Sequence, residues 1–220
     1  YVDNLQIVHS ANLDADGRGP EGCYYNQFTD ALKRDWKVVD EGPMDDLLGI
    51  EVQRNKDGSI TLHQRKYIEK IVKRFLPSGP PSRVQTGASV PYSEDFLVHI
   101  NAALTQLTPE YPELVRNFQE RIGCLMYAAT STRPDIAYAV HQLCQCMQKP
   151  TPALVAETDR VFAYLARHAS DGLTYTSDFA RLAGYADASW ETRKSTSGWM
   201  VLWQGSVLTW GSRKQKCVAL

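Results

Sequence analysis

The chain opens with "YVDN", in which Asp3 and Asn4 precede Leu5 and Ile7, two apolar residues at strand spacing. Phosphoryl transfer by two metal ions needs carboxylates that hold the ions about 4 Å apart, and a tight turn between strands is a rigid place for them. Asn4 is neutral and holds Mg²⁺ less well than a carboxylate, although its amide still offers one oxygen. By themselves, these four residues favour an exposed Asp-Asn turn over a metal site.

A second group of residues suggests contact with phosphates. Residues 65–75 are predicted to form a helix with one apolar and one basic side. The apolar side holds Tyr67, Ile68, Ile71, Val72 and Phe75, and the basic side holds Lys66, Lys70, Lys73 and Arg74. Such a stripe is either a solvated helix face or a surface that binds a nucleic-acid backbone. Alone, the stripe favours the solvated face.

The bulk composition is that of a globular protein. The 220 residues allow one large domain or two small ones, and 43% hydrophobic residues are enough for a core. A formal net charge of −1 gives no global attraction to nucleic acid, so such binding needs a local patch. No apolar run is long enough to span a membrane. Five Cys without a C-x-x-C pair favour reduced, intracellular thiols. The missing first Met and the ending "KCVAL" suggest that both ends are cut edges.

The elements that must position these side chains alternate between strands and helices. A strand is expected at the start, a loop over 12–23, and a helix over 24–36 with Phe28, Ala31, Leu32 and Trp36 on one face. "LLGIEVQR" and "GSITLHQ" read as a hairpin, with Asp57-Gly58 supplying the positive φ angles of a tight turn. Residues 77–96, rich in Pro, Ser and Gly, are the best linker candidate.

The second half of the chain is predicted to be helical and then extended. Apolar stripes predict helices over 113–130, 134–148 and 152–168, and alternation predicts strands over 181–190, 195–203 and 206–212, with a turn at Gln204-Gly205. His141, Cys144 and Cys146 share the second of these helices. Their spacing does not gather all three on one face, which argues against a metal site there.

Five stretches carry a resemblance to a known family. They are "YVDN", "DDLLGIEVQRNKDGSITLHQRKYIEKIVKRF", "RIGCLMYAATSTRPDIAYAVHQLCQCM", "VFAYLARHASDGLTY" and "LAGYADASWETRKSTSGWMVLWQGSVLTWGSRKQKCVAL". In this order they resemble the Pol polyprotein of copia-type LTR retrotransposons, from the reverse transcriptase palm into the ribonuclease H domain. "TRPDIAYAV" and "RKSTSG" are its most specific parts, and the likeness covers nearly the whole chain.

The resemblance implies roles for single residues. Asp3 resembles a polymerase metal ligand, whereas Asn4 departs from the family's "YVDD". Leu48-Gly49 would lie at the primer grip, where the absence of a side chain lets the backbone approach the primer end. The four basic residues of 65–75 would form a thumb face for the primer–template duplex, binding phosphates without reading sequence.

The resemblance also implies roles near the C-terminus. Asp187 resembles the first carboxylate of ribonuclease H, and the alternative is an ordinary Asp in a strand-end turn. Arg193 and Lys194 would either approach the hybrid backbone or stay solvated. The family's cofactor is Mg²⁺. Its earlier palm carboxylate and the Glu of its "SSTEAEY" segment have no counterpart here, so we expect neither polymerase nor nuclease activity from this chain alone.

We therefore expect an α+β fold: a reverse transcriptase palm and thumb remnant, a helical connection, and a partial ribonuclease H-like β-sheet that leans on the helices. The expected regions are 1–76 (end of the palm and first thumb helix), 77–112 (linker), 113–176 (helical thumb or connection) and 177–220 (start of the ribonuclease H-like domain).

Three functions stay open. The chain is a piece of an RNA-directed DNA polymerase with ribonuclease H, a non-catalytic nucleic-acid-binding module or inert relic of a decayed element, or a structural domain without a nucleic-acid role. The partners implied by the resemblance are an RNA/DNA primer–template duplex and the remainder of the Pol polyprotein, with no membrane. The implied location is intracellular, in cytoplasmic virus-like particles or the nucleus.

Overall fold

The computed structural model describes residues 5, 7, 13–14, 16–39, 42, 44–79, 89–105, 111–176, 181–189 and 195–216. The chain divides into two compact units, Tyr1–Asp45 and Asp46–Leu220. The four-region division expected from the sequence stays a prediction. Among the described helices, none combines the length and the apolar character that a membrane span requires.

The first unit contains the helix α1 (Tyr24–Asp35), as its apolar spacing predicts. The loop before it is fixed by Asn26, whose side chain bonds the backbone of Gly19 and Pro20, and by a bidentate Arg18–Asp30 pair. The expected apolar face is not buried: Phe28 and Trp36 are 50% and 70% exposed. The described part of this unit has no second helix or sheet that could cover that face.

In the second unit, the first sheet has the antiparallel order β1-β2-β3-β4. Its strands are β1 (Asp46–Leu47), β2 (Ile50–Arg54), β3 (Ile60–His63) and β4 (Gly172–Tyr175). The predicted hairpin is present as β2 and β3. Its turn is longer than expected, since the hydrogen bond that closes it runs from the Asn55 amide to the Ser59 carbonyl. Within this turn Gly58, at φ 83°, has a positive φ, whereas Asp57 does not. The run "LLGIEVQR" is interrupted by a separate turn at Leu48 and Gly49.

Strand β4 was not expected from the sequence. It is short, and its pairing with β3 joins residues more than a hundred positions apart. A side chain at Gly172 would place its Cβ 2.2 Å from the Leu62 carbonyl oxygen. Glycine is therefore required where β4 meets β3, because the two backbones approach too closely for any Cβ.

The second sheet consists of β5 (Leu182–Ala188), β6 (Thr196–Trp203) and β7 (Ser206–Lys214), antiparallel in that order. These strands agree with the three that alternation predicts. The predicted turn is present, with Gln204 at φ 54° and Gly205 at φ 74°. Side chains join the edges of the two sheets: the Tyr175 hydroxyl donates to the Val207 carbonyl at 2.8 Å, and Ser206 donates to the Thr174 carbonyl.

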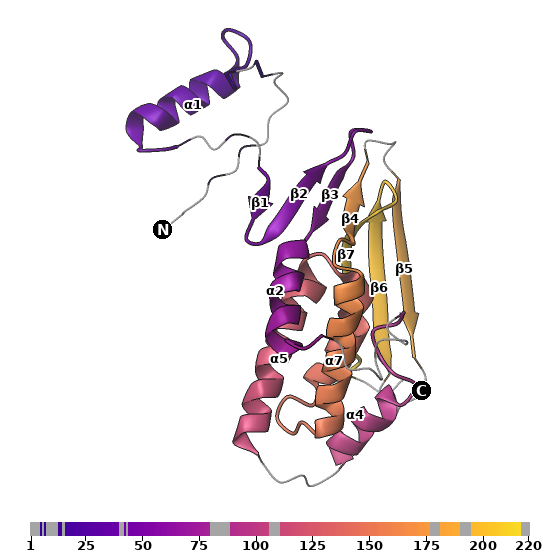
Figure 1. Ribbon diagram of the computed structural model, residues 1–220. Coiled ribbons are helices and arrows are strands. Elements are labelled where there is room, and N and C mark those ends of the chain that lie inside the picture. The colour runs from indigo at the N-terminus through magenta and orange to yellow at the C-terminus, as the bar shows by residue number, and fades with distance from the viewer. Residues whose placement is uncertain are drawn as a thin grey trace. The chain divides into compact units, whose positions relative to one another are not determined.

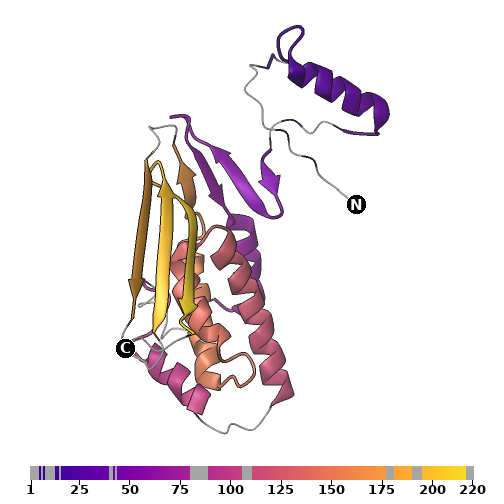
Figure 2. The same cartoon turned by 180° about the vertical axis from the view of Figure 1, so that it is seen from behind.

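Helices line one side of the second sheet (Figures 1 and 2) and enclose the core. They are α2 (Arg65–Phe75), α4 (Phe96–Thr105), α5 (Pro112–Ser131), the 3₁₀ turn η1 (Pro134–Ile136), α6 (Ala137–Cys144) and α7 (Pro152–Arg167). Side chains with no more than 1% exposure include Ile68, Phe96, Phe118, Ile122, Leu125, Ile136, Leu143, Leu154, Phe162 and Leu165. Each such side chain contributes about 1.5 to 3 kcal/mol by leaving water.

Two differences from the expected helices have simple causes. Helix α4 lies in the region that was expected to be a linker. The sequence did not predict this helix, because "FLVHINAALT" is apolar on nearly all sides and shows no stripe. The helix expected over 134–148 starts as a 3₁₀ turn and ends at Cys144. The expected helix over 65–75 coincides with α2, and those over 113–130 and 152–168 match α5 and α7 within one residue at either end.

The motif "TRPD" joins the helices at a buried charge. Arg133 is 1% exposed and makes two hydrogen bonds to the Asp135 carboxylate, at 3.0 and 2.6 Å. Its remaining nitrogen donates to the His168 carbonyl at the end of α7, and the Tyr164 hydroxyl donates to Asp135. Burial alone would raise the pKa of Asp135, but the bonds and charge of Arg133 and the bond from Tyr164 lower it below its usual value.

The second sheet leans on the helices, as expected. The Trp210 indole donates to the Ala129 carbonyl on α5 at 2.8 Å. His141 Nε2 on α6 accepts the Lys214 amide at 3.0 Å, and Gln145, directly after α6, accepts the Lys214 ammonium. Because His141 acts as an acceptor, its imidazole must be unprotonated at Nε2. Burial first, and then the charges of Lys214 and Arg213, lower the pKa of His141 below 6.5.

We predict that Asp135→Asn lowers the free energy of unfolding by about 3 kcal/mol, because it leaves the enclosed Arg133 charge without a counter-charge. Urea unfolding followed by circular dichroism measures the change. Glu69→Gln is the matched control, since it removes the carboxylate of an exposed ion pair with Arg65 and should lie within experimental error. Equal effects of the two substitutions would refute a special role for the buried pair.

We also predict that the second unit loses stability as the pH falls below about 6.5, where the unfolded chain takes up a proton on His141 more readily than the folded one does. The loss continues until the pH reaches the lowered pKa of the folded state. Urea unfolding between about pH 8 and pH 5 should give a shallower decline for His141→Gln, which keeps a side-chain acceptor but does not titrate. An unchanged decline would assign the pH dependence to other groups.

Candidate nucleic-acid interface

The predicted basic stripe lies on the solvent side of α2. Lys66, Lys70, Lys73 and Arg74 are all exposed, whereas Ile68 and Ile71 are buried on the opposite side. Two of these four cations face carboxylates: Lys66 lies 3.4 Å from Glu51, and Arg74 lies 2.6 Å from Glu120. For Lys70 and Lys73, the described residues offer no ion pair. The stripe is therefore half neutralised within the chain.

Glu51 connects the strands to the start of α2. Its carboxylate accepts the backbone amide of Lys66 at 2.9 Å, one of the first amides of the helix, which have no partner inside the helix. Burial would raise the pKa of Glu51, but the Lys66 amide, His63 and the Lys66 ammonium lower it below its usual value. A negative charge at a helix N-terminus is also stabilised by the helix dipole. Glu51 therefore ties strand β2 to the N-terminal end of the basic stripe.

The turn at Leu48 and Gly49 projects into solvent between β1 and β2. Both residues have left-handed backbones, with φ of 53° and 77°. The Asp46 carboxylate accepts the Gly49 amide at 3.2 Å, and the Tyr127 hydroxyl on α5 donates to the Leu48 carbonyl. No atom lies within 4 Å of the place where a Cβ of Gly49 would be, so this stretch of backbone can be approached closely.

Aromatic contacts hold this turn to the helices. Tyr127 packs edge-to-face on Tyr67 of α2 with ring centroids 5.0 Å apart, and the Tyr67 hydroxyl donates to the Cys124 carbonyl on α5. The exposed turn and the basic stripe are thus both attached to the α2–α5 pair. The predicted primer-grip residues Leu48 and Gly49 are therefore attached to the same pair of helices as the predicted thumb residues.

The predicted metal ligands are not assembled by the described residues. Asp187 lies in β5 opposite Gly198, is exposed, and accepts the amide of Ala188. Within the described part of the chain, no three His, Cys, Asp or Glu side chains are placed to hold a metal ion. Asp3, Asn4, Arg193 and Lys194 lie outside the described residues. One carboxylate does not fit a two-metal site, because Mg²⁺ gives up water reluctantly.

Sequence reasoning missed Glu51 and Tyr127, which fix the start of α2 and the β1–β2 turn. Glu51 occupies a strand position that alternation marks only as polar, and Tyr127 lies outside the apolar stripe of α5. Both act through partners that lie far away in the sequence, at Lys66 and Leu48.

The comparison with curated proteins gives relatives over the whole chain. It is 29% identical over 230 residues to the Retrovirus-related Pol polyprotein from transposon TNT 1-94 of Nicotiana tabacum, covering 100% of this chain and 16% of that protein. It is 32% identical over 224 residues to the Retrovirus-related Pol polyprotein from transposon RE1 of Arabidopsis thaliana, covering 99% of this chain and 14% of that protein. The chain belongs to the copia-type retrotransposon Pol polyproteins.

This Pol segment spans about one sixth of the length of the tobacco polyprotein. A shorter match, 40% identical over 104 residues, covers 45% of the segment and 73% of the Secreted RxLR effector protein 161 of Plasmopara viticola. No family model matches the Pol segment. No solved structure matches it either, so its fold rests on its own α+β architecture.

We predict that Leu48→Asn stabilises the Pol segment by about 0.5 to 1 kcal/mol, because Asn tolerates the left-handed conformation that strains Leu. Thermal or urea unfolding measures the gain. Leu182→Asn is the matched control: Leu182 is also exposed, at 63%, but lies in the regularly paired backbone of β5 and should show no gain. A loss of stability in Leu48→Asn would show that the Leu side chain contributes more than the strain costs.

Proposed function

We propose that this Pol segment holds the primer–template duplex of a reverse transcriptase and continues into the start of a ribonuclease H domain. Its place among the Pol polyproteins supports the assignment of origin. The observation that carries the binding role is the exposed basic face of α2, which Glu51 and Lys66 fix to the β1–β2 hairpin. A rigid basic face beside an exposed backbone turn suits a regular duplex better than a flexible tail would.

The binding is proposed to follow the backbone of the duplex and not its sequence. Lys70 and Lys73, which have no ion pair among the described residues, would contact phosphates directly. Lys66 and Arg74 would first have to leave their carboxylate partners before they contact a phosphate, which reduces their net contribution to the free energy of binding. The open space beside Gly49 would let a strand end approach the hairpin turn.

Catalysis is proposed to need the rest of the polyprotein. In the complete enzyme, Asp3 with Asn4 and, separately, Asp187 would each contribute to a Mg²⁺ site that stabilises the charge of the transferred phosphoryl group. Asp187 alone does not fit such a site, so the segment by itself is expected to bind without extending or cutting a strand. The remaining Pol polyprotein, which its relatives contain, is the proposed partner that supplies the other carboxylates.

Asn4 favours a second candidate, a non-catalytic nucleic-acid-binding module left by a decayed element. An amide at this position weakens metal binding and leaves the basic face of α2 unaffected. An inert relic is the limiting case, in which binding is lost as well. The binding module and the inert relic differ in whether duplex binding persists.

We predict that the double substitution Lys70→Ala, Lys73→Ala weakens binding to an RNA–DNA duplex and lowers the slope of log K against log salt concentration by about 2, since about one counterion is retained per lost phosphate contact. Binding is measured by fluorescence anisotropy at several salt concentrations. The loss should be equal for duplexes of different sequence, because phosphate contacts carry no sequence information.

The control is Lys37→Ala, Lys149→Ala, which removes two exposed lysines that lie outside α2. It should leave both the affinity and the salt slope nearly unchanged. Equal losses in the two double variants would indicate diffuse electrostatic attraction and overturn the assignment to α2. The absence of binding at low salt would leave the inert relic as the description of this chain.

A further inference from the structure

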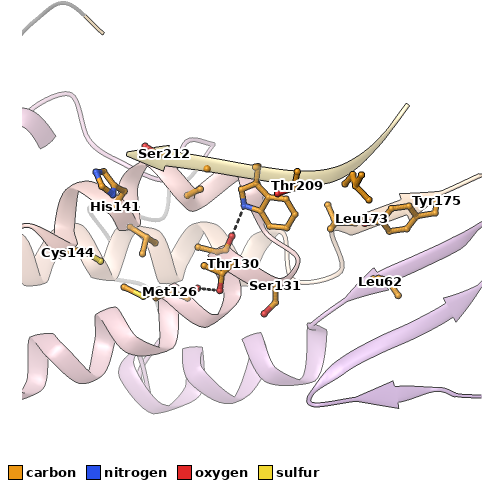
Figure 3. A pocket seen from close by; sticks show the side chains of 16 residues that line it. Leu62, Met126, Thr130, Ser131, His141, Cys144, Leu173, Tyr175, Thr209 and Ser212 are labelled. Atoms are coloured by element: carbon orange, nitrogen blue, oxygen red, sulfur yellow. Dashed lines mark hydrogen bonds between the residues drawn. The ribbon is translucent and has the colours of Figure 1, made fainter. Parts of the chain in front are cut away.

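The second sheet turns one of its two faces toward the helices. Figure 3 shows this side of β7, where Met126, Thr130 and His141 of α5 and α6 lie opposite the strand around a cavity of about 500 Å³. Trp210 belongs to the same side, because its indole donates to the Ala129 carbonyl of α5. The contacts that attach the sheet therefore use this face, and the other face remains available.

The other face, called the outer face below, carries two exposed tryptophans. Successive side chains of a strand point to opposite faces, so Gly211, next to Trp210, belongs to the outer face. Trp199 of β6 pairs with Gly211, and a Cβ on that glycine would lie 2.7 Å from the nearest indole atom. Trp203 follows on the same strand at an even spacing and shares this face. The two side chains are 42% and 41% exposed.

No carboxylate of the three strands lies on the outer face. Asp187 is the one acidic residue in β5, β6 and β7. Its neighbour Ala186 pairs with Trp199 and so shares the outer face, which places Asp187 on the opposite one. A negatively charged ligand therefore meets no repulsion from these strands on the outer face.

A cation lies near each tryptophan. Arg213 comes two residues after Gly211 on the same face of β7, and it is exposed. Arg181 lies just beyond the Trp203 end, because its carbonyl accepts the Gln204 amide, and it is also exposed. The described residues form no ion pair with either arginine. Two aromatic rings with a free guanidinium near each are the combination that binds bases by stacking and phosphates by charge.

We propose that the outer face binds single-stranded nucleic acid, with bases stacked on Trp199 and Trp203 and phosphates at Arg181 and Arg213. Four residues along a strand span about 13 Å. Stacked bases in a duplex rise by about 3.4 Å, so one strand reaches both rings only when its bases are splayed apart, which a single strand permits. The site is distinct from the proposed duplex site, because no residue of α2 belongs to the second sheet.

Fluorescence anisotropy of a labelled ten-nucleotide oligothymidylate, titrated with the whole chain, tests the stacking. Trp203→Leu should weaken binding about fivefold or more, the effect of losing one stacked base. Trp203→Phe should recover most of the lost affinity, because a ring is present again. The matched control is Trp36→Leu, which makes the same change at a 70% exposed tryptophan directly after α1 and should leave the affinity unchanged. Circular dichroism checks that each variant is folded.

An RNA–DNA duplex separates this site from the one on α2. Trp203→Leu should leave duplex affinity unchanged, and it should still weaken oligothymidylate binding when Lys70 and Lys73 are both alanine. If the chain binds no duplex but its oligothymidylate binding depends on Trp203, the outer-face site holds and the α2 assignment fails. Equal oligothymidylate affinity of Trp203→Leu and the unsubstituted chain, or equal losses in Trp203→Leu and Trp36→Leu, would overturn the proposal and leave the outer face to a protein partner.

The arginines are tested by salt dependence. Arg181→Ala with Arg213→Ala should lower the slope of log K against log salt concentration for the oligothymidylate by about 1.4, since each phosphate contact on a single strand contributes about 0.7. The double variant Lys37→Ala, Lys149→Ala is again the control and should leave the slope nearly unchanged. Equal slopes in the two double variants would overturn the phosphate contacts.

Discussion

The guanidinium of Arg133 lies enclosed between α5, η1 and the end of α7, and the Asp135 carboxylate balances its charge there. Since an enclosed cation without a partner is very costly, this pair restricts how the segments can be arranged. The neighbouring residue Thr132 donates to the buried Gln64 at the start of α2, and Tyr127, one turn earlier, bonds the β1–β2 turn. The C-terminal end of α5 thus connects α2, α7 and the first sheet.

The second sheet depends on the same end of α5 and on α6. Trp210 bonds the Ala129 carbonyl, and Lys214 bonds His141. Its opposite face keeps large apolar side chains exposed, among them Trp199 at 42% and Trp203 at 41%. Trp199 lies directly over Gly211, where a Cβ would come within 2.8 Å of the indole. The sheet is therefore held from one side, by a few hydrogen bonds around an incompletely filled cavity.

The proposed duplex-binding residues and the predicted metal ligand Asp187 lie in different parts of the fold. The basic side of α2 and the β1–β2 turn are fixed through Glu51, Tyr67 and Tyr127. Asp187 lies on a different sheet, without neighbouring metal ligands among the described residues. A duplex-binding role requires only the first of these features, whereas phosphoryl transfer requires carboxylates that the described part of the Pol segment does not bring together.

The sequence by itself determined the local elements with a clear period. The 3.6-residue stripes gave α2, α5 and α7, alternation gave the second sheet, and the Gly-containing turns of β2–β3 and β6–β7 were recognisable because only a few residue types accept a positive φ. The motifs also determined the family. The basic side of α2 was predictable for the same reason, since the spacing of its lysines fixes their common face.

Only the tertiary structure decided the features that depend on distant partners. Strand β4 exists because its backbone can pair with β3, and α4 is a helix although its sequence has no polar face. The chain's own carboxylates at Glu51 and Glu120 neutralise half of the basic stripe, which no local pattern reveals. The cavity beside β7 is equally invisible in the sequence, because it arises where side chains from separate elements fail to fill the space between a sheet and two helices.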